Sequence, residues 1–118
     1  MIYQKKGDLR EQEGYRLHEW GSFTRYLEIG DDLYAVRQVD LFASGNSLRY
    51  DRTHWSDDFG MMADAKYSDK WDKWWGAAEK ISAEEFETVW QIAGESTWHQ
   101  LQLNSRECDG LPPWIPTL

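Results

Sequence analysis

Eight tryptophans in a chain of 118 residues constrain the fold more than any other feature of the sequence. An indole is large, and its N–H group needs a hydrogen-bond partner when it is buried. One modest core does not need eight indoles, so we expect some of them to lie half-exposed beside carboxylates. The densest run is Ser68-Asp69-Lys70-Trp71-Asp72-Lys73-Trp74-Trp75.

The charge of the chain limits the partners that it can bind. The formal net charge is −8, and the pI is about 4.8. Binding to a phosphate backbone depends largely on Lys and Arg, so no nucleic-acid partner is expected. A surface that mixes aromatic and acidic side chains instead favours the docking of a basic protein.

The length of the chain predicts one domain over residues 1–118, and we expect this domain in the cytoplasm. No stretch of the chain approaches the roughly 18 apolar residues of a membrane span, so no membrane partner is expected. Residues 1–8 lack the apolar region of a signal peptide, and Cys108 is the only cysteine. Both features are typical of a protein in a reducing compartment. The oligomeric state stays open.

Strand patterning dominates the first half of the chain. Residues 1–13 are polar and predict an arm or a weak first strand. The segments with strand character are residues 15–20, 23–29, 33–42 and 47–51. Gly and Asp or Asn mark turns between the last three of them, and such short connections require antiparallel neighbours. We therefore expect a meander of about four strands.

Helical patterning follows in the second half. Ser82 and Glu85 form a capping box, and a stripe of apolar residues at helical spacing lies behind it. Gly94 is a plausible C-cap for this helix. A second helix is expected near residues 66–78, and the segment from Trp98 to Leu103 predicts a short final strand or a packed tail. Residues 104–118 contain three prolines and predict a tail.

These patterns together predict an α+β fold, in which a four-stranded antiparallel sheet packs against helices near 66–78 and 82–94. The core should contain apolar side chains from both layers. The expected core residues are Leu27, Ile29, Val36, Val39, Leu41, Leu48, Phe86, Val89 and Trp90.

Two segments carry a resemblance to a known family. They are the strand Tyr34-Ala35-Val36-Arg37-Gln38-Val39 with its Gly-containing turn, and the segment Ser82-Ala83-Glu84-Glu85-Phe86. Both resemble a family of small, functionally unassigned bacterial α+β domains over about residues 15–95. The family has a Pro-rich middle where this chain has the Trp-rich segment 55–75. The resemblance implies a small α+β scaffold and brings no catalytic residues with it.

In character the chain is also similar to bacterial immunity proteins, including those of contact-dependent growth inhibition systems. Such proteins are small, acidic and without catalytic motifs, and they neutralise a cognate toxin by covering it. The similarity is one of type, since that class shares no motif. It implies a basic toxin, for instance a nuclease, as the partner.

The acidic and aromatic runs supply the expected partner-binding residues. These are Trp55, Asp57, Asp58, Asp69, Asp72 and Trp74. Aromatic anchors would supply buried hot spots, and the acids would steer association. Two alternatives stay open: the Trp run packs on the sheet, or the loop tucks Trp55 and Phe59 into the core.

No enzymatic activity, cofactor or metal is expected. The three histidines, His18, His54 and His99, have no metal-ligand spacing, and a zinc site needs about four ligands. No nucleophile stands beside a base in a recognisable motif. An alternative function is a small ligand-binding or enzymatic domain with a pocket around His54, Asp57 and Trp55, because a histidine beside carboxylates can serve acid–base chemistry.

Overall fold

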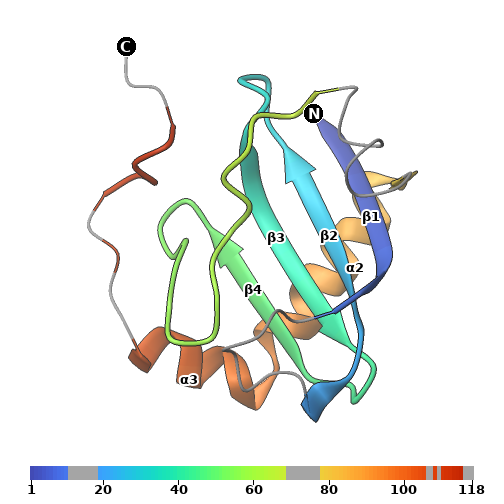
Figure 1. The fold of residues 1–118 in the computed structure, drawn as a ribbon, viewed down its shortest axis with the longest axis vertical. Coiled ribbons are helices and arrows are strands. Elements are labelled where there is room, and N and C mark those ends of the chain that lie inside the picture. Colours follow the sequence, from blue (N-terminus) through green and yellow to red (C-terminus); the bar gives the residue numbers. More distant parts are fainter. Residues whose placement is uncertain (11–18, 69–77, 106–107, 109, 116–118) are drawn as a thin grey trace.

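An antiparallel sheet forms the centre of the computed structural model, which describes residues 1–10, 19–68, 78–105, 108 and 110–115. The five strands are β1 (Ile2–Leu9), β2 (Phe23–Ile29), β3 (Ala35–Phe42), β4 (Ser47–Asp51) and β5 (Glu79–Lys80). The two helices are α2 (Ala83–Gly94) and α3 (Thr97–Ser105). The spatial order is β4-β3-β2-β1-β5, so β1 to β4 form a meander and β5 adds to the free side of β1 (Figure 1).

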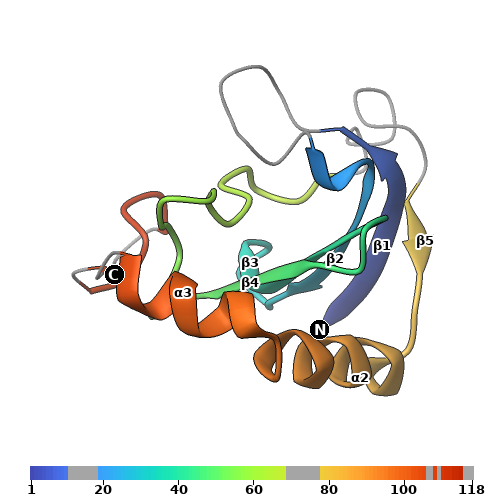
Figure 2. The ribbon, with the colours of Figure 1, turned by 90° about the horizontal axis from the view of Figure 1, so that it is seen from below.

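Different elements cover the two faces of the sheet. Helix α2 lies across one face, where Val39, Phe86 and Ala93 form a small buried cluster (Figure 2). The segment that follows β4 crosses the other face, over a larger cluster that includes Leu27, Leu48 and Met62 (Figure 1). Successive strand residues point to opposite faces of the sheet. Because each face is covered, strand side chains are buried on both of them.

An ion-pair network joins α2 to the sheet. Arg37 of β3 donates to both carboxylate oxygens of Glu28 on β2, at 2.7 and 2.8 Å, and it also binds Glu87 of α2. Its guanidinium carbon lies 4.9 Å from the centre of the Phe86 ring and 5.1 Å from that of Trp90. The hydrogen bonds from Arg37 hold the pKa of Glu28 below its usual value, so the buried carboxylate stays ionised.

The start of α2 agrees with one half of the capping-box prediction, the bond between the Ser82 side chain and the Glu85 amide. Ser82 has an extended backbone, and its hydroxyl oxygen accepts a hydrogen bond from the Glu85 amide at 3.1 Å. The Glu85 carboxylate accepts from Lys5 of β1 at 3.1 Å, which fastens this end of the helix to the sheet. Gly94 was expected to be the C-cap, but it is the last residue of the helix, and Glu95 takes the C-cap position.

The α+β class and the antiparallel sheet are confirmed, with five strands in place of about four. The additional strand pairing comes from the N-terminus, since residues 2–9 form β1 and pair with both β2 and β5. Of the strand expected at 15–20, residues 15–18 lie outside the described residues, and residues 19–20 form a 3₁₀ turn. In the helix expected near 66–78, residues 69–77 lie outside the described residues, and 66–68 have no regular structure.

The segment from Trp98 to Leu103 was expected to be a strand or a tail, and this prediction is wrong because it forms most of α3. Ser96 precedes the helix, and its hydroxyl oxygen accepts from the Trp98 amide at 3.1 Å. The helix buries Gln102 rather than an apolar stripe. The periodicity of apolar residues, on which a helix prediction depends, is therefore missing.

The core prediction is partly confirmed. Leu27, Ile29, Val39, Leu48 and Phe86 are buried. Val36, Leu41, Val89 and Trp90 are only partly buried. Val89 and Trp90 lie along the margins of the α2 contact, where helix residues keep part of their surface in solvent.

Replacing Ser82 by Ala should lower the free energy of unfolding by about 1 kcal/mol, because the Glu85 amide loses its acceptor. Urea denaturation measures this change. The matched control is Thr88→Ala, which removes an exposed hydroxyl that bonds to the Glu84 carbonyl within α2. Thr88→Ala should lower the free energy of unfolding by no more than about 0.5 kcal/mol. Equal losses in the two variants would contradict the cap.

Candidate functional site

The loop that follows β4 is organised around the carboxylate of Asp57. Its Oδ1 accepts hydrogen bonds from the Tyr50 hydroxyl at 3.0 Å, from the Phe59 amide at 2.8 Å and from the Gly60 amide at 3.1 Å. Its Oδ2 lies 2.9 Å from Nε2 of Gln102 and 3.0 Å from Nε2 of His54. The Asp57 side chain has no exposed surface.

The environment of Asp57 also acts on Tyr50. Burial raises the pKa of the Tyr50 hydroxyl, and the negative charge of Asp57 raises it further. The phenol therefore stays protonated and remains a donor to Asp57. The His54 ring stacks on Tyr50, with 6.2 Å between the ring centres and an angle of 4°. The cluster connects β4, the loop and α3.

Asp57 was expected to contact a partner, and in this structure its side chain is buried. Five donors converge on its two oxygens, so a partner would have to break several of these hydrogen bonds to reach it. A one-dimensional pattern shows an acid between aromatic residues but cannot show that donors from β4 and α3 meet there. The structure does bring His54 and Asp57 together, as the acid–base alternative supposed.

Trp55 and Asp58 are not buried to the same extent as Asp57. The Trp55 indole N–H donates to the Gly110 carbonyl at 3.2 Å, and its ring packs edge-on against Trp114 at 5.3 Å between ring centres. Trp55 and Phe59 are partly buried against the core, which agrees with the alternative in which the loop tucks both rings inward. Asp58 is exposed and its carboxylate is accessible. Asp69, Asp72 and Trp74 lie outside the described residues.

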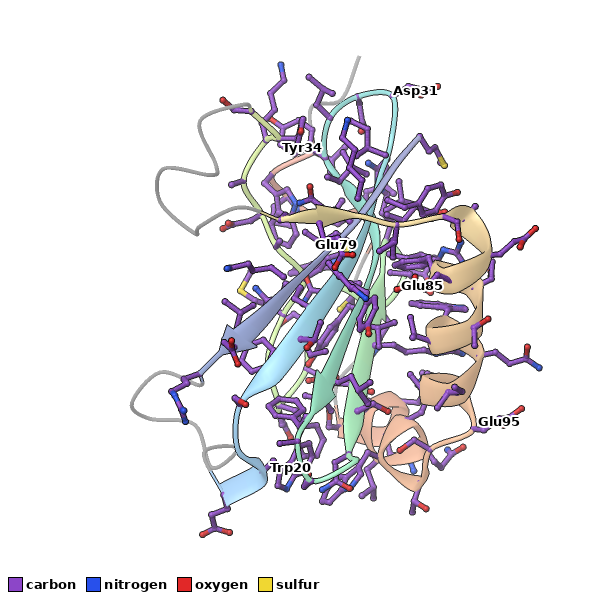
Figure 3. The ribbon with its side chains drawn as sticks, turned by 90° about the vertical axis from the view of Figure 1, so that its right-hand side faces the viewer. Trp20, Asp31, Tyr34, Glu79, Glu85 and Glu95 are labelled. Carbon is purple, nitrogen blue, oxygen red and sulfur yellow. The ribbon has the colours of Figure 1, made fainter. Side chains whose placement is uncertain are left out.

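A second candidate surface is the outward side of the helical layer formed by α2 and α3. Residues 81–105 contain four glutamates and no Lys or Arg. Glu85 pairs with Lys5 and Glu87 pairs with Arg37, which leaves Glu84 and Glu95 without an ion-pair partner among the described residues. Figure 3 shows Glu95 at the end of α2, pointing away from the sheet.

Exposed apolar side chains also occur on the two helices. Ile92 of α2 is 56% exposed, and Leu101 and Leu103 of α3 are 44% and 45% exposed. On an ideal helix, residues 84, 88, 91 and 95 follow one line, and Ile92 lies beside it. The sequence does not indicate this surface, because an exposed isoleucine cannot be told from a core residue until the buried side of its helix is known.

No described group of three or more His, Cys, Asp and Glu side chains could hold a metal ion. In the parts of the chain that the structure describes, no helix combines the length and apolar character that crossing a membrane requires. Comparison with known proteins found no matching family model, no matching curated protein and no matching solved structure.

Two neighbouring acids provide a matched test of the Asp57 cluster. Asp57→Ala leaves donors from β4, the loop and α3 without an acceptor, and should lower the free energy of unfolding by about 3 kcal/mol or more. Asp58→Ala removes an exposed carboxylate and should change it by less than about 0.5 kcal/mol. Urea denaturation of both variants measures the difference. A small loss for Asp57→Ala would contradict the structural role of this carboxylate.

Proposed function

We propose that this chain is a cytoplasmic immunity protein that neutralises a basic toxin by covering it, as in contact-dependent growth inhibition or related systems. The observation that carries the proposal is the outward side of the helical layer, which carries two glutamates without an ion-pair partner among the described residues and an exposed isoleucine, in a stretch, residues 81–105, without Lys or Arg. Such a surface needs no chemistry of its own to block a partner.

Charge supports a basic partner. Glu84 and Glu95 stand three turns apart on the same side of α2, about 16 Å along the helix axis. A net charge of −8 adds a long-range field of the same sign. Complementary fields raise the rate of association and suppress wrong partners more than they raise affinity. The same acids could stand in for the phosphates of a nuclease substrate.

Apolar anchors supply the second requirement. Binding energy in protein interfaces comes mainly from a few side chains that become fully buried, whereas rim charges contribute little. Ile92, Leu101 and Leu103 are exposed enough to be buried by a partner. Trp55 does not fit this role in the same way, because its ring and its N–H group already have contacts within the chain.

The test is binding kinetics against a candidate toxin, such as one encoded directly upstream, at two salt concentrations. Reversing Glu84 and Glu95 to Lys should slow association about tenfold at low salt and flatten its salt dependence. Ile92→Ala should act mainly on the dissociation rate and raise it about tenfold.

The matched control reverses two exposed acids elsewhere, Asp31 and Asp64, and changes the net charge by the same amount. Asp31 lies in the turn between β2 and β3, and Asp64 lies in the segment after β4. This control should keep most of the association rate. Equal slowing by both double variants would show that only net charge matters, and unchanged binding by the Glu84 and Glu95 variant would remove this surface from the proposal.

A further inference from the structure

Helix α3 closes the β4 edge of the sheet through one side chain. The Gln102 carboxamide accepts from the backbone N–H of Arg49 at 3.1 Å and donates to its carbonyl oxygen at 3.0 Å. Its Nε2 also reaches Asp57. Gln102 is completely buried. The amide therefore takes the place of a neighbouring strand at Arg49, which removes an open backbone pair from the edge.

The Arg49 side chain makes a second link to α3. Its Nη2 lies 3.1 Å from Nε2 of His99, three residues before Gln102. A guanidinium has donors only, so Nε2 of His99 must be the acceptor and the imidazole must be neutral. Arg49 also donates to the Trp90 carbonyl at 3.1 Å and lies over the Trp90 ring at 4.3 Å.

The charges around His99 oppose its protonation. Burial is the largest cause that lowers its pKa, and the charge of Arg49 on β4 is the next. His54 of the loop acts in the same direction, and Asp51 of β4 acts against them. From α2 the cluster receives the Trp90 carbonyl, which is neutral. No carboxylate of the described residues forms an ion pair with Arg49.

One large apolar side chain and several polar contacts dock α3. Leu101 and Leu103 point toward solvent, and Gln102 is the residue that the helix buries completely. Trp98 is the large apolar side chain that α3 packs against the core, where it meets Trp20 and Phe59. The position of this helix therefore depends strongly on the polar contacts to β4.

We propose that α3 is an acid-releasable cover over the β4 edge, in which a proton on Nε2 of His99 opens the contact with Arg49 and frees the helix. The proton removes the acceptor and places two cations 3.1 Å apart. Release of α3 then leaves the Arg49 backbone N–H and carbonyl without their Gln102 partner. This inference does not depend on the proposed toxin binding.

Proton linkage gives the direction in which pH changes the docking of α3, and the pH range of that change. A histidine whose pKa is lowered in the docked state binds fewer protons there than in the released state, so docking weakens as pH falls. The weakening begins near pH 6.5, the ordinary value for a free histidine, and ends below the lowered pKa. The carboxylates with lowered pKa values, such as Glu28 and Glu87, lose their contribution only at lower pH.

Amide hydrogen exchange by NMR tests the proposal. The Arg49 amide is protected only while Gln102 is docked, so its protection factor should fall up to about tenfold between pH 7.5 and pH 5.5. The amide of Val39, in the interior strand β3, should keep its protection factor. Equal loss at both amides would indicate global unfolding and overturn the proposal.

Two variants assign the effect to His99. His99→Asn offers an oxygen to Arg49 and does not titrate, so the Arg49 protection factor should become independent of pH over this range. His54→Asn, which changes the other described histidine, should keep a pH-dependent Arg49 protection factor, altered only by loss of the small His54 contribution to the His99 pKa. An NMR titration of the parent provides an independent check, and a His99 pKa at or above the ordinary value would overturn the proposal even if a variant fails to fold.

Discussion

The structure depends most on the buried carboxylate of Asp57. A buried charge is costly unless hydrogen bonds replace its hydration, and here five donors do so. The donors come from β4, from the loop and from α3, so one side chain fixes three elements at once. Without the carboxylate, the Tyr50 hydroxyl and the Gln102 amide would be buried polar groups without this acceptor. The loop that covers one face of the sheet and the helix that closes its edge therefore share one constraint.

Arginines organise the opposite face in a related way. Arg37 is neutralised by Glu28 and Glu87 and stays a fully paired link between the sheet and α2. Arg49, on the neighbouring strand, has a histidine, a carbonyl and the Trp90 ring as its partners. The two cations lie over the same indole, yet only the second depends on the protonation of its neighbour. This difference separates a permanent contact from one that pH can change.

The distribution of acids connects the fold with the proposed function. Several acids are consumed internally: Asp57 in the loop cluster, Asp40 with Arg25 at 2.9 Å, and Glu28 with Arg37. The charges left for a partner are therefore fewer than the sequence suggests. On α2 these are Glu84 and Glu95, beside Ile92. Net charge alone therefore does not show which acids are free to meet a partner.

Local patterns were enough for the elements that bury an apolar face. The alternation of residues 33–42 predicted β3, and the Ser82 cap with its apolar stripe predicted α2. Each signal comes from residues that lie close together in the chain. The sequence also determined the acidic character of the chain and the α+β class. Helix α3, the burial of Asp57 and the role of Gln102 could not be predicted in this way. They depend on polar groups that are far apart in the chain, and only the tertiary structure decides which donor meets which acceptor.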